Sequence, residues 1–231
     1  LHDALPISKL NKAIRTTMLI IIPSAIGMAV LANPIMQLLF SGTDARAGYA
    51  LAGGCVSIVF YALSTVTNGV LQAIGKVSDP VKNAAITLVI HLAFVIIGLN
   101  VLSASYSLAI LVGGSVVYSF FMVMFNAHSI YKHLGYKSNM DIIFLRPAVA
   151  AAIMGVAAIG LYKLIYHIFI INMPGRTVVA NAFGLLISIL IAMMIYAFLM
   201  LRIGGYTEEE LLDMPKGAAI VKVAKKLKLL K

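Results

Sequence analysis

Six long segments of this sequence are almost wholly apolar, and short polar stretches separate them. They span about residues 16–39, 48–73, 81–102, 106–128, 143–170 and 177–201. A helix needs about 20 apolar residues to cross a hydrocarbon core of about 30 Å, so each segment is long enough. Backbone groups in lipid must satisfy their own hydrogen bonds, and these segments lack the two-residue alternation of a membrane β-barrel. The pattern therefore predicts an all-α, polytopic membrane bundle of six transmembrane helices.

The composition of the chain also favours lipid over water. Hydrophobic residues make up 61% of its 231 residues and charged residues 11%, whereas a soluble domain carries about 25% charged residues. The formal charge of +10 does not indicate nucleic-acid binding, because the lysines and arginines lie at the ends of the apolar segments. The single cysteine, Cys55, excludes a disulfide within the chain. No sequence motif of a hydrolase, a metalloprotease or a P-loop enzyme is present, so we predict a non-enzymatic protein without a cofactor or metal site.

Positive charge is distributed unequally between the two ends of the predicted helices. If the six spans alternate in direction, fifteen lysines and arginines fall on the side that holds residues 9–15, and only Arg46 and Arg176 fall on the other. Lys163 lies inside the fifth segment, near its outer end. Cytoplasmic loops of membrane proteins are enriched in lysine and arginine. We therefore expect a multi-pass protein of the plasma (inner) membrane with both ends of the chain in the cytoplasm.

The two ends of the chain lie outside the spans. The first residues, LHDALPIS, begin without methionine and match nothing after them, so we set residues 1–8 apart as a candidate non-native start and expect a fragment of a longer protein. In the tail, Thr207 to Glu210 has the pattern of a capping box. A basic amphipathic helix follows, and its lysines are expected to contact the anionic membrane surface: Lys222, Lys225, Lys226 and Lys228. The alternative is that this helix docks on cytoplasmic loops.

Polar side chains inside the spans are the candidates for function. Thr65, Asn68 and Gln72 are spaced by three and four positions, so they share one helical face. Such a face predicts either the lining of a hydrated substrate path or interhelical hydrogen bonds that hold the bundle together. His91, near the middle of the third segment, is either a neutral ring hydrogen-bonded to a neighbouring helix or a titrating group that lines a cavity. His133 flanks a predicted cytoplasmic loop and needs no special role.

Prolines and small residues mark places where the spans bend or approach one another. Pro23 and Pro34 lie in the first segment, where each predicts either a static kink or a bending point. Gly113 and Gly114 in the fourth segment predict close helix packing. All acidic residues lie outside the predicted spans, whereas proton or sodium coupling usually relies on an acidic residue within the bilayer.

Four stretches resemble parts of one transporter family. The run NGVLQAIGKVSDPVKNAAI (68–86) resembles a helix–loop–helix in the C-terminal half of polysaccharide-biosynthesis flippases, which belong to the multidrug/oligosaccharidyl-lipid/polysaccharide (MOP, MATE-like) superfamily. Within that superfamily it looks most like the stage V sporulation protein B type. ANPIMQLLFSG (32–42), the Gly113–Gly114 helix and the tail LLDMPKGAAIVKVAKKLKLL (211–230) are similar to further parts of the same family.

The resemblance implies a fold and a mechanism. Family members have about fourteen helices in two lobes of six plus an extra pair, so these six would be helices nine to fourteen. Residues 9–130 would then form four helices of the C-terminal lobe, residues 131–203 the extra pair, and residues 204–231 a cytoplasmic tail. Alternating access of two lobes around a central cavity is the implied mechanism. Residues that clamp a diphosphate would lie in the N-terminal lobe, since no arginine lies deep in a span of this chain.

The implied function is a flippase for lipid-linked oligosaccharide or a cell-wall precursor. Thr65, Asn68, Gln72 and His91 are then candidates for the substrate path, and the partners would be the amphipathic substrate, membrane lipids and the N-terminal lobe of the same protein. One alternative is a cation-coupled multidrug exporter of the same superfamily. Another is a non-transporting membrane scaffold in envelope assembly, in which the basic tail would be the working part. The sequence names neither the sugar nor the coupling ion.

Overall fold

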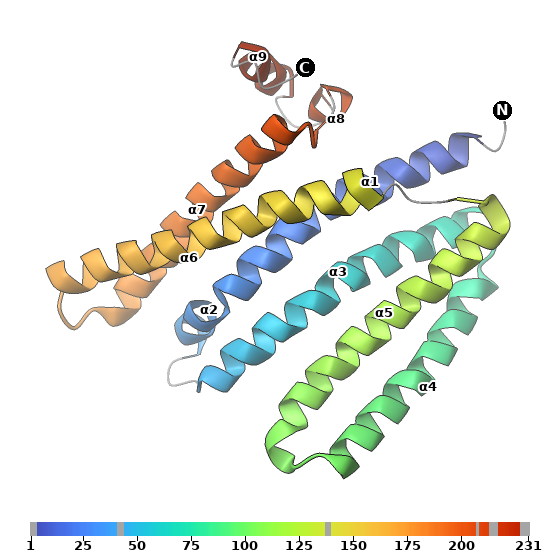
Figure 1. Ribbon diagram of the computed structural model, residues 1–231, viewed down its shortest axis with the longest axis horizontal. Helices are drawn as coiled ribbons and strands as arrows, with labels where there is room; N and C mark the ends of the chain where they lie inside the picture. Colours follow the sequence, from blue (N-terminus) through green and yellow to red (C-terminus); the bar gives the residue numbers. More distant parts are fainter. Residues whose placement is uncertain (1–3, 41–43, 137–139, 207, 213–216, 227–231) are drawn as a thin grey trace. The chain divides into compact units, whose positions relative to one another are not determined.

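The computed structural model describes residues 4–40, 44–136, 140–206, 208–212 and 217–226. Every regular element in these ranges is a helix (Figure 1), which confirms the predicted all-α class. The chain divides into two compact units, unit 1 from Leu1 to Asn139 and unit 2 from Met140 to Lys231.

Within the described residues, six helical segments are long and apolar enough to cross a membrane, which confirms the predicted number of spans. They are Lys9–Val30, Ala45–Ala73, Ser78–Val101, Ala104–Leu134, Asp141–Asn172 and Thr177–Ile203. The helices continue past the apolar stretches on which the prediction rested. The fourth span, for example, continues to Leu134, six residues beyond the predicted end at residue 128. The chain is therefore a multi-pass membrane protein.

The first apolar segment is not the single helix that was predicted over 16–39. It consists of α1 (Ala4–Val30) and α2 (Ala32–Leu39), and Leu31 separates them with φ −100° and ψ 12°. Pro34 explains the break, because its nitrogen carries no hydrogen to donate to the carbonyl of Val30. Pro23 lies inside α1, which continues past it. One proline of the segment thus coincides with a break and the other does not.

In unit 1, α3 (Ala45–Ala73) packs against α1 and α5 (Ser107–Leu134), and α4 (Ser78–Val101) packs chiefly against α5 (Figure 1). A short 3₁₀ turn, η1 (Ala104–Tyr106), connects α4 to α5. The fully buried side chains of this unit include Met18, Leu31 and Leu71. The predicted close packing at the paired glycines is present, since a Cβ on Gly114 would lie 2.8 Å from Val95 Cγ2.

The helix α4 has the most exposed surface of the six spans. Only 6% of its most apolar stretch is buried, against 22% to 39% in the other five spans. Large apolar side chains are exposed along its length, among them Val89, Ile96 and Ile97. A helix that is apolar all round is suited to contact with lipid or with other membrane helices. Few side chains of α4 therefore contact the neighbouring helices and hold it in place. Several of those that do are polar.

In unit 2, α6 (Arg146–Asn172) and α7 (Thr177–Ile203) lie side by side along their lengths. Most of the side chains buried between them are small, as the alanines and glycines of the fifth segment lead one to expect. Tyr162 donates a hydrogen bond from its hydroxyl to Asn181 Oδ1 at 3.0 Å. The rings of Phe169 and Phe183 stack with their centroids 5.4 Å apart.

Arg146 holds the two ends of this helix pair together. A short π-helical turn, η2 (Asp141–Leu145), precedes α6, and Arg146 Nε lies 3.3 Å from Asp141 Oδ2. Its Nη1 donates to the carbonyl oxygens of Ile203 at 3.4 Å and Gly204 at 3.1 Å, which are left without partners where α7 ends. A cation at this position also interacts favourably with the helix dipole.

Candidate functional site

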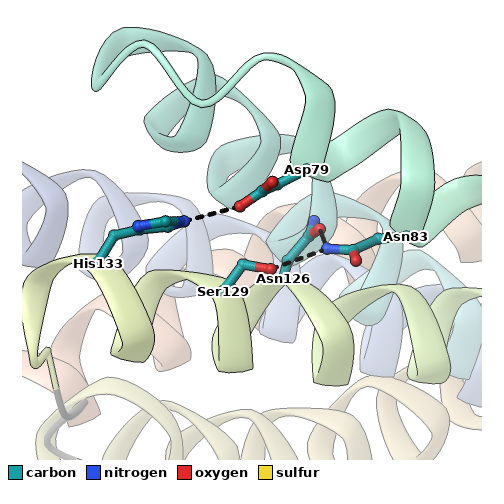
Figure 2. Close-up of polar contacts among 5 residues, drawn as sticks. All are labelled: Asp79, Asn83, Asn126, Ser129 and His133. Carbon is teal, nitrogen blue, oxygen red and sulfur yellow. Dashed lines mark hydrogen bonds and ion pairs between the residues drawn. The ribbon is translucent and has the colours of Figure 1, made fainter.

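A cluster of amides and hydroxyls joins α3, α4 and α5, and we name it the Asn126 cluster. Its members are Ser64, Thr67, Asn68, Asn83, Asn126 and Ser129. Asn126 lies at its centre and has no exposed surface. Its Nδ2 donates to Asn68 Oδ1 at 2.7 Å and to Thr67 Oγ1 at 3.1 Å, both on α3. Its Oδ1 accepts a hydrogen bond from Asn83 Nδ2 on α4 at 2.9 Å (Figure 2).

The Asn126 cluster satisfies polar groups that would otherwise be unpaired in an apolar bundle. A buried amide without a partner is costly, so Asn126 fixes the rotation of three helices at once. Asn83 Nδ2 also lies 3.2 Å from Ser129 Oγ, one turn from Asn126 on the same helix. Hydrogen bonds between membrane helices contribute on average about 0.6 kcal/mol each. The cluster as a whole is therefore suited to setting the register of α3, α4 and α5.

An ionisable pair lies one turn beyond this cluster. His133 Nε2 on α5 is 2.8 Å from Asp79 Oδ2 on α4 (Figure 2). Asp79 precedes Asn83 by four residues, and His133 follows Ser129 by four residues, so the two pairs form successive rungs between α4 and α5. From the sequence His133 was expected to need no special role, and its contact with Asp79 was not predicted, because loop charges do not show which helix faces the ring.

The three candidates on α3 lie in different environments. Asn68 belongs to the Asn126 cluster, and this contact is the interhelical bonding that was one of the two interpretations of the polar face. Thr65 is exposed and donates from its hydroxyl to the Tyr61 carbonyl of its own helix at 2.9 Å. Gln72 is also exposed. The structure thus brings one of the three into contact with another helix, and the role of all three in a substrate path stays a prediction.

His91 is fixed against α5 by a backbone carbonyl. Its Nδ1 lies 2.8 Å from the oxygen of Gly114, and its ring meets the ring of Tyr118 edge-on with centroids 6.0 Å apart. Tyr118 in turn lies beside Tyr61 of α3, with 5.9 Å between the centroids. His91 is half-buried. The hydrogen bond to a neighbouring helix, one of its two predicted states, is present.

Four side chains of α4 lie along one row. Asp79, Asn83, Thr87 and His91 occur every four residues, which is the spacing of neighbours on a helix surface. Asp79, Asn83 and His91 contact α5, and Thr87 is fully buried, with its hydroxyl donating to the Asn83 carbonyl at 2.7 Å. The row is the polar face that α4 presents to the bundle.

Asn83 and Asn126 were not predicted as site residues from the sequence. The available signal was the presence of an asparagine inside or at the edge of an apolar segment, which requires a partner when it is buried. Which partner it has depends on helix rotation, and spacing within one helix does not give that. No group of three histidine, cysteine, aspartate or glutamate side chains within the described ranges is arranged to hold a metal ion.

The tail lysines are exposed where the structure describes them. Lys222 and Lys226 are exposed on α9 (Gly217–Lys226), and Lys225 Nζ lies 2.6 Å from Glu208 Oε1 on α8 (Glu208–Leu212). Leu211 and Val221 are buried, and the two short helices pack on each other. Thr207 of the predicted capping box and Lys228 lie outside the described residues.

Comparison with known protein families gives a match over most of the chain. A family model described as "Lipid II flippase MurJ" matches residues 6–180 of the chain, which is about three-quarters of its length. No curated protein and no solved structure matches the chain.

Proposed function

Since the chain belongs to the lipid II flippase MurJ family, a member of the MOP superfamily, we propose that it takes part in moving a lipid-linked cell-wall precursor across the membrane by alternating access. The observation that carries this proposal is the family match over residues 6–180, which covers the first five spans and the first residues of the sixth. In this reaction the polar head of the substrate crosses between leaflets, and no covalent bond changes.

Lipid II is the favoured substrate, because the matching family is described by it. The likeness of residues 68–86 to the stage V sporulation protein B type supports a second candidate, another lipid-linked oligosaccharide. Both substrates carry a sugar and a phosphate on a long lipid, so the amides and hydroxyls of the spans suit either. Binding chemistry alone therefore does not distinguish the two substrates, and a measurement of transport is needed to choose between them.

The proposed function assigns each part of the chain to a part of the transporter. We assign residues 9–130 to four helices of the C-terminal lobe, residues 131–203 to the extra pair, which would offer a groove for the lipid tail, and residues 204–231 to the tail. The division into two compact units at residues 139 and 140 supports a separation between the first four spans and the last two. The charge distribution supports a cytoplasmic location for both ends.

The candidate residues take two roles in this proposal. Thr65, Asn68, Gln72 and His91 line or border the path of the polar head, with exposure of Thr65 and Gln72 and half-burial of His91 as the supporting observations. Lys222, Lys225, Lys226 and Lys228 contact anionic lipid headgroups. The Glu208 ion pair reduces the charge that Lys225 offers, so Lys222 and Lys226 carry most of this contact among the described lysines.

The test is translocation by the purified protein in proteoliposomes. We expect labelled lipid II in one leaflet to reach the other, where an added enzyme or quencher detects it, and a lipid-linked oligosaccharide of different sugar to move more slowly. Movement of a cationic dye but of neither lipid would instead support a multidrug exporter. Absence of all three activities, with envelope growth rescued by the protein but not by a form lacking residues 204–231, would support a scaffold.

A further inference from the structure

His91 is the ionisable group nearest the middle of α4. It is the fourteenth of the 24 residues from Ser78 to Val101, so it lies at mid-depth of this span. Its neighbours along the helix are apolar, from Val89 and Ile90 to Leu92 and Ala93. An ionisable side chain at such a depth is a candidate for function by itself, since a purely structural position is filled at lower cost by an apolar residue.

The hydrogen bond to Gly114 decides which ring nitrogen carries the proton. A carbonyl oxygen only accepts, so Nδ1, at 2.8 Å from the Gly114 oxygen, is the donor. In the neutral ring Nε2 is then an acceptor without a hydrogen. Gly114 keeps Nδ1 occupied whether the ring is neutral or charged, so a second proton can bind only at Nε2.

Two residues of α5, Gly114 and Tyr118, pack closely against the His91 ring. A Cβ on residue 114 would lie 3.0 Å from His91 Cε1 and 3.2 Å from Nδ1, so the ring reaches the carbonyl because residue 114 is glycine. One turn further along α5, the Tyr118 ring meets the imidazole edge-on. The ring is half-buried, so part of it faces away from α5. A fixed donor nitrogen, a packed aromatic neighbour and a half-buried ring are together suited to a proton-binding site.

We propose that His91 binds and releases a proton through Nε2 as α4 and α5 change their arrangement. In the arrangement described above the ring is neutral, with Nδ1–H bound to Gly114. When water reaches Nε2, a hydronium ion transfers a proton to it and leaves as water, and the reverse transfer to water restores the neutral ring. Because a charged ring is better solvated by water than by apolar side chains, proton binding favours the hydrated arrangement.

The groups that face the ring leave this charge without a carboxylate partner. Tyr118 of α5 contacts the ring, and the ring of Tyr61 of α3 lies 5.9 Å from that of Tyr118 between centroids. Asp79 is the one acidic residue in the sequences of α3, α4 and α5, and it pairs with His133. It precedes His91 by twelve residues, or about 18 Å along the helix. Protonation of His91 thus adds a positive charge to the middle of the bundle, and no carboxylate of α3, α4 or α5 other than that of Asp79 is present to neutralise it.

The direct test is nitrogen NMR on the protein labelled in histidine and held in lipid nanodiscs. Comparison with the His91→Asn spectrum assigns the His91 signals. As the pH is lowered over the range in which the protein stays folded, we expect Nε2 to gain a hydrogen while Nδ1 keeps its own. A ring that never gains this second hydrogen, or one that carries its single hydrogen on Nε2, would overturn the proposal.

Matched variants test whether this proton matters for transport. His91→Asn places an amide donor near the position of Nδ1 and so retains a bond to Gly114, but it cannot titrate. His91→Gln places its amide near Nε2 and loses that bond. If the proposal holds, translocation by the unaltered protein changes with pH, and His91→Asn folds normally but removes this dependence. An unchanged pH profile in His91→Asn contradicts the proposal, and failure of the unaltered protein to translocate contradicts the proposed function while the NMR titration still decides the proton site.

Discussion

The Asp79 carboxylate lies 2.8 Å from His133 Nε2, one turn from the point where Asn83 meets Asn126. The first contact can carry charge, and the second is neutral. Together they hold the beginning of α4 against the end of α5 by two different kinds of interaction (Figure 2). A helix with so little buried apolar surface depends on such contacts for its position.

The Asp79–His133 pair should show a measurable coupling energy. In a double-mutant cycle with Asp79→Asn and His133→Gln, we expect the two effects on unfolding free energy to be non-additive, because the two side chains contact each other and only about a quarter of each is exposed. The measurement is unfolding in detergent. As a control, a cycle between His133→Gln and Asp44→Asn should be additive, because Asp44 lies just before the beginning of α3. Equal coupling in both cycles would mean that the pair has no specific interaction.

Replacing the central amide should destabilise unit 1. Asn126→Leu removes the donor to Asn68 Oδ1 and leaves Asn83 Nδ2 with Ser129 as its remaining partner, at a cost of about 1–3 kcal/mol. The matched control is Asn100→Leu, because Asn100 is exposed and bonds only to the Ile96 carbonyl of its own helix. Thermal unfolding of the two variants gives the comparison. If both variants unfold at the same temperature, Asn126 does not hold the three helices together.

A methyl group at Gly114 should separate α4 from α5. The new Cβ in Gly114→Ala would lie 2.8 Å from Val95 Cγ2 and 3.0 Å from His91 Cε1, so we expect loss of the His91 bond and a lower unfolding temperature. Gly54→Ala is the control, because nothing lies within 4 Å of a Cβ there. Alanine in a helix is favoured over glycine by about 0.5–1 kcal/mol, so this control should unfold at the same or a higher temperature. Equal unfolding temperatures of the two variants would show that α4 and α5 can move apart at residue 114 without loss of stability.

The predicted orientation can be tested with single cysteines. In a background carrying Cys55→Ser, Val77→Cys lies in the connection between α3 and α4, and Pro174→Cys lies between α6 and α7. A thiol reagent that does not cross membranes should label residue 174 in intact cells and residue 77 only after permeabilisation. Neither change alters the loop charges. Labelling in the opposite order would reverse the assignment of both chain ends to the cytoplasm.

The spans were predictable from the sequence because lipid imposes one constraint on every helix that crosses it. The number of spans follows from apolar length alone, and the predicted limits differ from the observed ones where polar residues extend a helix past the bilayer, as at Leu134. The break at Leu31 was not predicted as a helix boundary. Two prolines lie in that segment, and the sequence does not show which of them interrupts the backbone bonding.

The polar contacts were predictable only in kind. The sequence indicated that Asn68 and His91 would need partners, since polar groups in lipid are bonded. It did not identify Asn126 or the Gly114 carbonyl as those partners. The choice depends on how α5 is rotated and how deep it sits beside α3 and α4, and these are properties of the packed bundle. His133 was missed for the same reason, because Asp79 lies 54 positions away in the chain.

The row of Asp79, Asn83, Thr87 and His91 gives α4 an unusual pattern of tolerance to substitution. In a library in which each position of α4 is replaced in turn by every amino acid, most positions should accept any apolar side chain. Loss of function should recur at every fourth position from 79 to 91. Two versions of this helix could therefore differ at most of their positions and still pack in the same way, provided that these four positions are kept.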